Sequence, residues 1–170
     1  MSQNGTFKIL VCVPAYNEAK NISEIVNKSK KYADEVIVYD DGSTDETYNL
    51  ATSAGARVIK SPTNTGYGTA IRALFQAAKE QNADIMVTLD SDGQHNPDQI
   101  PRLVEPLRGQ QFDIVIGSRF LNKEDEEKVP KYRTFGIKTI TKLTQGASYS
   151  GLTDSQSGFR AYNRNALSKI

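Results

Sequence analysis

The feature that most constrains this chain is an apolar run that stops abruptly at two carboxylates. Residues 83–89 are largely apolar, and Asp90 and Asp92 follow one residue apart. We interpret the run as a buried strand that delivers both side chains to its carboxyl end. In an extended chain, residues two apart point to the same side, so the two carboxylates can face one point. Mg2+ binds such oxygens, and it uses only one or two protein carboxylates when phosphates fill its other positions.

Two simpler interpretations compete with a metal site. A calcium-binding EF-hand loop needs glycine at its sixth position and a bidentate glutamate at its twelfth. Counted from Asp90, Gly93 is fourth and Pro101 is twelfth, so this loop is excluded. The second interpretation, an acidic turn between strand and helix, is not excluded by this stretch alone, because Asp, Ser and Gly are common turn residues.

Length, charge and hydropathy limit the classes of protein to which this chain can belong. The 170 residues suffice for a single domain with a sizeable core. A formal net charge of +1 provides no bulk field to attract nucleic acid, so we expect no nucleic-acid partner. No apolar run approaches the roughly 18 residues of a membrane span, and the polar start does not resemble a signal peptide. We therefore expect a cytoplasmic protein in which the single cysteine, Cys12, is a buried, inert thiol.

Strand-like and helix-like stretches alternate along the chain. This alternation predicts an α/β fold, with a mainly parallel central sheet flanked by helices and joined by right-handed crossovers. The expected strands are residues 7–13, where Pro14 ends the strand, 35–39, 57–60, 83–89, 113–118 and 158–162. Helices are expected after Asn21, between Ser43 and Gly55, around residues 71–78, between Asn96 and Gly109, over residues 136–145 and from Asn163 onward.

Helix starts carry their own signals. Asn21 with Glu24, and Ser43 with Glu46, have the spacing of capping boxes. Asn96 followed by Pro97 predicts an N-cap and a first helical residue. The charged stretch over residues 121–131 predicts an irregular surface loop.

Polar residues follow several of the predicted strands at the point where each strand ends. In open α/β sheets, ligands lie beyond the carboxyl ends of the strands. Residues 14–18, Asp40 with Asp41, residues 90–94 and Arg119 all fall at such ends. We therefore expect them to line one crevice.

Six short motifs, in this order, resemble family 2 glycosyltransferases. Their spacing is family-like from about residue 8 to residue 163, and the likeness is greatest to the dolichyl-phosphate mannosyltransferase and polyprenyl-phosphate glycosyltransferase branch. The motifs are Pro-Ala-Tyr-Asn-Glu at 14–18, Asp-Asp-Gly-Ser-Thr-Asp at 40–45, Asn64 with Gly66 and Gly68, Asp-Ser-Asp-Gly-Gln at 90–94, Gly-Ser-Arg at 117–119, and residues 154–160.

The resemblance implies a Rossmann-like GT-A fold over a single domain, residues 1–170. It also implies an inverting, metal-dependent transfer of a hexose from a nucleotide-diphosphate sugar, GDP-mannose or UDP-glucose. The implied acceptor is a polyprenyl or dolichyl phosphate, and the implied cofactor is Mg2+ or Mn2+.

The resemblance also assigns roles to residues. The nucleotide pocket falls to Pro14, Ala15, Tyr16, Glu18, Asp41, Asp90 and Ser91, with Asp41 meeting the base. The metal motif comprises Asp90, Asp92 and Gln94. Contacts to the acceptor or to phosphate fall to Arg119, Arg133 and Arg160, and the catalytic roles fall to Asp92, Arg119 and Asp154.

Elementary chemistry is compatible with these roles. A phosphate monoester has its second ionisation near pH 6, so a lipid phosphate is already largely a dianionic nucleophile and needs arginines more than a base. A hydroxyl acceptor would need a carboxylate to take its proton, and Asp154 is then the candidate.

Several residues have simpler explanations. Asp45 is expected to favour the start of a helix, and His95 to be a loop residue. Gly66 and Gly68 do not form a G-x-G-x-x-G fingerprint, so we interpret them as turn glycines.

Family members of this branch usually continue well past residues 158–160. A chain that ends at Ile170 is therefore expected to be either shortened at its C-terminus or a minimal enzyme. An apolar patch left by a missing element would favour a homodimer or peripheral association with the cytosolic face of a membrane.

Three alternatives remain beside the transferase. One is a non-catalytic nucleotide-sugar-binding domain without a complete acceptor site. A Mg2+-dependent aspartyl phosphatase or phosphotransferase would also gather carboxylates at strand ends. One of the haloacid dehalogenase type, however, would carry its Asp pair after the first strand, where this chain has residues 14–16. A sugar nucleotidyltransferase is disfavoured, because no glycine-rich, Arg-bearing loop follows the first strand.

Overall fold

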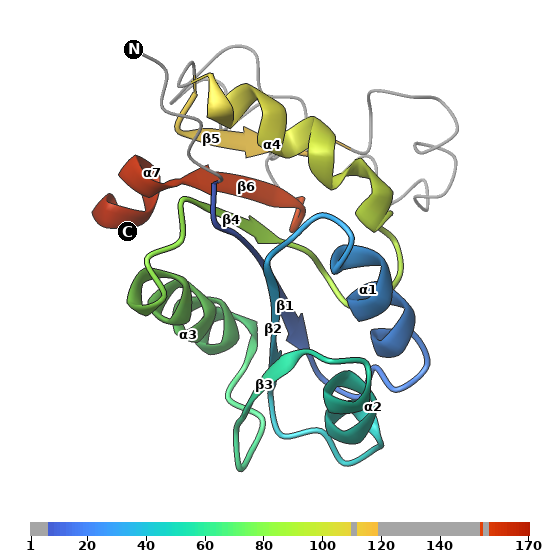
Figure 1. Cartoon of the computed structure of the whole chain (residues 1–170). Coiled ribbons are helices and arrows are strands. Elements are labelled where there is room, and N and C mark those ends of the chain that lie inside the picture. The colour runs from blue at the N-terminus through green and yellow to red at the C-terminus, as the bar shows by residue number, and fades with distance from the viewer. Residues whose placement is uncertain (1–6, 110–111, 119–153, 155–156) are drawn as a thin grey trace.

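The computed structural model describes residues 7–109, 112–118, 154 and 157–170. A central sheet of six described strands carries helices on both faces (Figure 1). The strands are β1 (Ile9–Ala15), β2 (Glu35–Asp40), β3 (Arg57–Lys60), β4 (Ile85–Thr88), β5 (Ile114–Ile116) and β6 (Arg160–Asn163). The helices are α1 (Ile22–Ser29), α2 (Thr47–Ser53), α3 (Tyr67–Glu80), α4 (Ile100–Arg108) and α7 (Arg164–Lys169), and a 3-10 turn, η1 (Pro97–Gln99), precedes α4.

The sheet confirms the predicted architecture and adds one unpredicted strand direction. The strand order is β3-β2-β1-β4-β6-β5, and the first four strands are parallel. β6 lies between β4 and β5 and is antiparallel to both. An apolar strand pattern carries no information on direction, so the sequence could not reveal this reversal. The register places Ala15 beside Asp40 and Asp40 beside Lys60, which brings three strand ends to one level.

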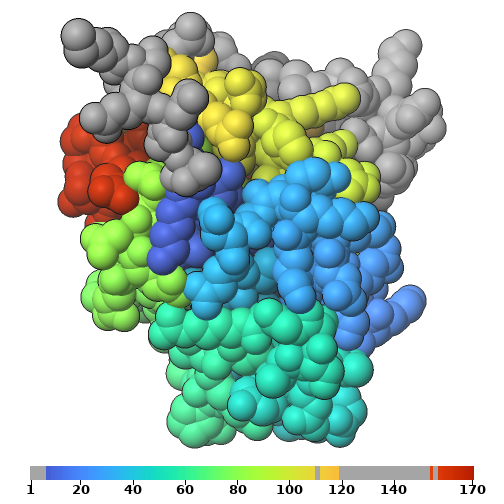
Figure 2. All heavy atoms as spheres, in the orientation of Figure 1, coloured from blue at the N-terminus to red at the C-terminus, as the bar shows by residue number. Residues whose placement is uncertain are grey.

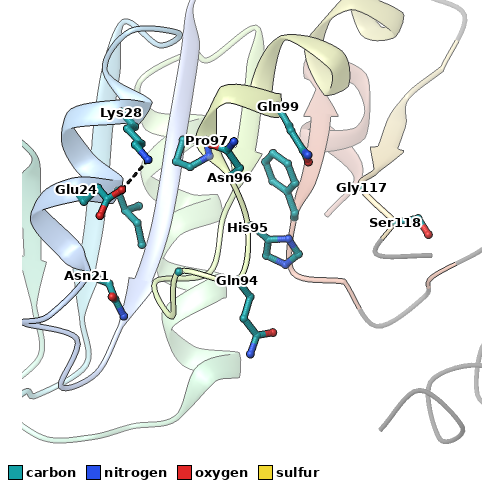
Figure 3. Close-up of a pocket in the computed structure, with 13 residues that line it drawn as sticks. Asn21, Glu24, Lys28, Gln94, His95, Asn96, Pro97, Gln99, Gly117 and Ser118 are labelled. Atoms are coloured by element: carbon teal, nitrogen blue, oxygen red, sulfur yellow. Dashed lines mark ion pairs between the residues drawn. The ribbon is translucent and has the colours of Figure 1, made fainter. Parts of the chain in front are cut away.

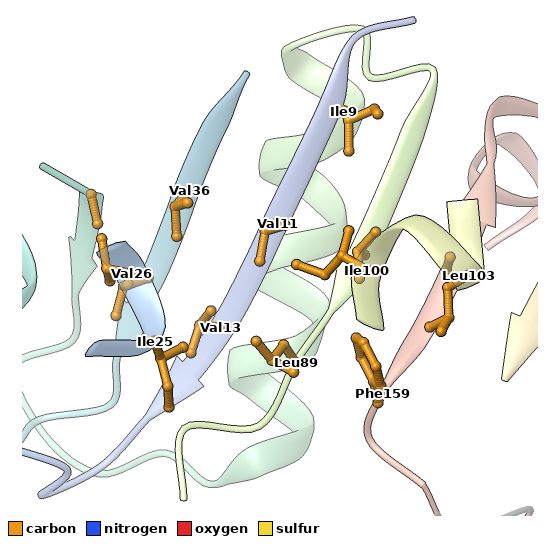
Figure 4. Close-up of a cluster of buried hydrophobic side chains, with 14 of the residues drawn as sticks. Ile9, Val11, Val13, Ile25, Val26, Val36, Leu89, Ile100, Leu103 and Phe159 are labelled. Carbon is orange, nitrogen blue, oxygen red and sulfur yellow. The ribbon is translucent and has the colours of Figure 1, made fainter. Parts of the chain in front are cut away.

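Strand β1 forms the centre of the core. All seven of its residues are buried. Val11 and Val13 face the cluster formed with α1 and α4 (Figure 4), whereas Leu10 and Cys12 pack with α3 on the other face. This division follows from the alternation of side chains along a strand. Burial, with a smaller contribution from the charge of Glu35, raises the pKa of the Cys12 thiol, which agrees with a buried thiol.

The helices form the outer layers. Helices α1, α2 and α4 cover one face of the sheet, and α3 and α7 cover the other, and atoms of both layers are visible in Figure 2. Helix α3 turns a buried stripe toward the sheet, because apolar residues recur along it at helical spacing. The stripe consists of Ala70, Leu74, Phe75, Ala77 and Ala78.

The prediction that Pro14 ends the first strand is wrong. β1 continues to Ala15, and Pro14 pairs with Tyr39 of β2. Pairing with β4 has already stopped at Cys12 and Thr88, so one edge of β1 is open at Pro14. A proline without an N–H is tolerated at an open edge.

Two of the three predicted helix caps are also wrong. The side chains of Asn21 and Glu46 form no cap hydrogen bond at α1 or α2. Asn21 instead donates to the Glu18 carboxylate over 3.2 Å, and the Ser43 hydroxyl accepts from the Asn17 backbone over 2.9 Å. The Asn96 cap is confirmed, since its side chain accepts from the Asp98 N–H.

Two predicted elements, the loop over residues 121–131 and the helix over residues 136–145, lie outside the described residues. Within the described ranges, no helix is both long and apolar enough to cross a lipid bilayer.

The α3 interface generates a stability prediction. Leu74 is fully buried, so Leu74→Ala should lower the free energy of unfolding by about 2–5 kcal/mol through lost burial and a residual cavity. Gln76→Ala on the exposed side of the same helix is the control, with an expected change within about 0.5 kcal/mol. Urea unfolding followed by circular dichroism measures both. Equal effects would contradict the assigned core face.

Candidate functional site

A cleft of about 480 Å3 lies at the carboxyl ends of β1, β2 and β4. The chain runs outward from β1 to β2 and β3 and then returns to β4 on the other side of β1, so the cleft lies at the topological switch point of the sheet. Its lining residues are Pro14, Ala15, Tyr16, Glu18, Asp41, Asn64, Gly66, Tyr67, Ala70, Asp90, Ser91, Asp92 and Gly158.

This cleft gathers the residues expected of a nucleotide pocket. Every residue predicted for that pocket lines it, and so does Asp92. Five lining residues were absent from the predicted site: Asn64, Gly66, Tyr67, Ala70 and Gly158. Asn64 and Gly66 belong to one of the six motifs, and the loop after β3 that carries them leaves the same edge of the sheet, so the sequence did contain a signal for this loop.

The turn after β4 presents the two carboxylates. β4 ends at Thr88, and Ser91 and Asp92 lie in a turn, so simple strand alternation does not explain why both aspartates face the cleft. The buried Ser91 hydroxyl donates to the Pro14 carbonyl over 2.7 Å and ties this turn to β1. The Gln94 N–H donates to Oδ1 of Asp92 over 2.9 Å. These bonds, rather than a continuous strand, fix the turn.

Asp90 has close neighbours from three separate segments. The Tyr67 hydroxyl donates to its Oδ1 over 3.3 Å, and Nε2 of His95 lies 3.8 Å from its Oδ2. A Cβ atom on Gly158 would overlap its carboxylate. His95 does lie in a loop, as expected, but its side chain is only 8% exposed and its ring packs against Phe159.

Tyr67 combines an exposed ring with a constrained hydroxyl. The residue is 57% exposed, yet its hydroxyl end points at Asp90. Partial burial, then the negative charge of Asp90 and the hydrogen bond to it, raise the pKa of the Tyr67 phenol. The phenol therefore remains a hydrogen-bond donor at neutral pH.

Asp41 organises the loop on the opposite wall of the cleft. Its carboxylate accepts the Thr65 N–H and hydroxyl on one oxygen and the Gly66 N–H on the other, over 2.7–2.8 Å. Burial alone would raise the pKa of Asp41, but these hydrogen bonds outweigh it and lower the pKa below its ordinary value. Its neighbour Asp40 is fully buried, and Oδ2 of Asp40 has no hydrogen-bond partner among the described residues.

Glu18 lies on the rim between the two walls. Partial burial is the main cause that raises its pKa, and the charges of Asp92 and Asp45 add to this, while the Asn21 hydrogen bond opposes it. Asp45 accepts the Thr47 N–H at the start of α2, which supports the helix-start role expected for it.

The cleft carboxylates suit a divalent cation that shares its ligands with a phosphate. Among the residues that the structure describes, no group of three or more His, Cys, Asp or Glu side chains could hold a metal alone. Mg2+ needs only one or two protein carboxylates when diphosphate oxygens complete its shell. Asp90 and Asp92 line one cleft and supply such oxygens, so the donor set fits this use.

The described residues predicted for catalysis or acceptor binding, Asp92 excepted, are not among those that line this cleft. Arg119 and Arg133 lie outside the described residues. Arg160, in β6, donates from Nε to the Ser157 carbonyl over 2.7 Å, and Asp154 is only 1% exposed.

Gln94 faces a second cavity of about 540 Å3 rather than the first cleft. Figure 3 shows Gln94 and His95 beside Gly117 and Ser118, which follow β5. Gln94 does not line the cleft that contains Asp90 and Asp92, so its position does not support the predicted role as a metal ligand.

A mainly parallel sheet with a carboxylate-lined cleft at its switch point has the architecture of a GT-A glycosyltransferase. The sequence matches Glycosyl transferase family 2 over residues 10–170, and the chain belongs to that family. The family and the enzyme class predicted from the sequence motifs are therefore confirmed.

Similar proteins include two enzymes named for lipid phosphates. The UDP-N-acetylglucosamine–dolichyl-phosphate N-acetylglucosaminyltransferase of Methanococcus voltae is 36% identical, covering 94% of this chain and 70% of that protein. The undecaprenyl-phosphate mannosyltransferase of Micrococcus luteus is 32% identical, covering 96% and 69%.

A solved structure shares the fold. Glucosyl-3-phosphoglycerate synthase from Mycobacterium tuberculosis, in complex with Mn2+, UDP-glucose and phosphoglyceric acid, superposes with a TM-score of 0.66 at 27% identity. The alignment covers 94% of this chain but 57% of that one, so this chain spans little more than half of the solved structure.

The hydrogen bonds of Asp41 generate a pH prediction. Because the folded-state pKa is lowered, the stabilisation is present above the unfolded value of about 3.9 and is lost as the pH falls through the lower folded value. Asp41→Asn should lower the free energy of unfolding by about 1–3 kcal/mol at pH 7, and its difference from the wild-type value should disappear below about pH 4. Urea unfolding between pH 3 and pH 7 measures both curves. Curves that stay parallel would contradict this role of Asp41.

Proposed function

We propose that this chain is a metal-dependent, inverting glycosyltransferase that moves a hexose from a nucleotide-diphosphate sugar to a polyprenyl or dolichyl phosphate. The observation that carries this proposal is the cleft at the switch point, which combines Asp41 on one wall with Asp90 and Asp92 on the other. Membership in glycosyl transferase family 2 and the similarity to enzymes named for lipid phosphates support it.

The donor is proposed to lie along the cleft. The base would lie near Asp41 and the diphosphate near Asp90 and Asp92, with a Mg2+ or Mn2+ ion held by these two carboxylates. When bound, such an ion supplies positive charge that stabilises the leaving diphosphate. The protein's own contribution is orientation, because Ser91 fixes the carboxylate turn and Asp41 fixes the loop opposite.

The burial of Asp154 supports a phosphate acceptor over a hydroxyl acceptor. A hydroxyl must lose its proton to a base within hydrogen-bond reach, and Asp154 is 1% exposed and does not line the cleft. A lipid phosphate needs no such base. Its charge would be matched by arginines, for which Arg160, Arg119 and Arg133 are proposed.

Nucleotide binding tests the donor side directly. Calorimetric titration with GDP and UDP, each with Mn2+ and again with EDTA, should show metal-dependent binding of one nucleotide. Transfer to a polyprenyl phosphate should follow with the matching sugar nucleotide. Metal-dependent binding without transfer to any acceptor would favour the non-catalytic binding domain, and a trapped aspartyl-phosphate would favour the phosphatase.

Two substitutions separate the donor and acceptor roles. Asp92→Ala should abolish metal-dependent nucleotide binding, because the cation loses one of its two proposed carboxylates. Arg160→Ala should leave nucleotide affinity within about twofold while reducing transfer at least tenfold, through loss of a charged hydrogen bond to the acceptor. Calorimetry and a transfer assay measure the two effects. An Asp92→Ala variant with unchanged nucleotide affinity would refute the metal assignment.

A further inference from the structure

Tyr67 lines the cleft but has no part in the functions assigned so far. It is the first residue of α3, and its hydroxyl donates a hydrogen bond to Oδ1 of Asp90 over 3.3 Å. The two residues belong to opposite walls of the cleft, one on α3 and one after β4. The hydrogen bond therefore bridges the cleft at the carboxylate proposed to hold the cation.

The backbone just before Tyr67 is fixed independently. Asp41, itself 4% exposed, accepts the N–H groups of Thr65 and Gly66 over 2.8 Å. Gly66 adopts φ +90°, a conformation that residues with a Cβ rarely adopt. The Tyr67 side chain thus projects from a backbone that has little freedom to shift.

The other side of Asp90 is closed by backbone. A Cβ atom on Gly158 would overlap the Asp90 carboxylate, and the Gly158 carbonyl accepts from the Thr88 hydroxyl over 2.8 Å. Asp90 therefore lies between a hydrogen-bond donor and a wall of main chain. Both neighbours restrict the orientations open to its carboxylate.

We propose that Tyr67 is a positioning residue for Asp90. The Tyr67 hydroxyl holds the Asp90 carboxylate in the orientation that a divalent cation bound with a nucleoside diphosphate requires. This inference rests on the proposed function, in which Asp90 and Asp92 hold the cation. A carboxylate that is already oriented loses less side-chain entropy when the cation binds. The hydroxyl, rather than the ring, is what this role needs.

The test is the Mn2+ requirement of a Tyr67→Phe variant. Calorimetry measures the Mn2+ concentration that gives half-maximal binding of whichever nucleotide, GDP or UDP, the wild type prefers. The variant should need about three- to tenfold more Mn2+, the range expected for one typical hydrogen bond that is open to solvent. Nucleotide affinity at saturating Mn2+ should stay within about twofold.

Two further variants sharpen the comparison. Tyr32→Phe is the matched control, because Tyr32 also donates to an aspartate, Asp98, over 2.9 Å but lies outside the cleft. Its Mn2+ requirement should equal that of the wild type. Gly158→Ala crowds Asp90 from the opposite side and should raise the requirement as well.

Each other outcome overturns the inference in a recognisable way. A wild-type Mn2+ requirement in Tyr67→Phe would show that the hydroxyl does not position Asp90. A lower requirement would show that the hydroxyl competes with the cation. Weaker nucleotide affinity at saturating Mn2+, with an unchanged Mn2+ requirement, would indicate that the phenol contacts the nucleotide instead. Nucleotide binding by the wild type that does not depend on Mn2+ would refute the proposed function itself. Failure of the inference and failure of the proposed function are therefore distinguishable.

Discussion

The structure depends on the pairing of β1 along both edges. A fully buried strand must have its backbone N–H and C=O groups hydrogen-bonded, and parallel pairing with β2 and β4 provides this for β1. The registers that result, Ala15 beside Asp40 and Cys12 beside Thr88, decide where each strand stops. The cleft is the space left beyond those stopping points.

Polar side chains join the loops at the rim of the cleft. Asn21 binds Glu18, Asn17 binds Ser43 and Thr44, and Asp45 accepts the Ala19 N–H. The bonds of Asn17 and Asp45 connect the loop after β1 to the loop after β2, whereas the Asn21–Glu18 bond lies within the loop after β1. The loops after β1 and β2 are thereby held as one unit, which suits a site that must present oxygens at fixed positions.

Apolar runs were sufficient to predict β1, β2 and β4, because burial between two helix layers demands such runs. The other three strands were predicted from short stretches within the alternation of strands and helices. The ordered motifs were sufficient to predict most of the cleft. Tyr67 and Gly158 were missed, because each acts on Asp90 through a contact that local patterns do not encode. The direction of β6 and the extension of β1 past Pro14 were missed for the same reason: both depend on which neighbouring strand is present. Arg119 and Arg133 lie outside the described residues, so their placement stays a prediction.

The position of β6 has a consequence for how the chain is made. Among the described strands, β5 joins the sheet only through β6, which lies between it and β4. During synthesis β5 emerges well before β6, so the pairing of these two strands must wait until residues 160–163 have emerged. The same late segment carries Gly158, which completes the surroundings of Asp90. The cleft therefore cannot reach its complete form before Gly158 has been synthesised.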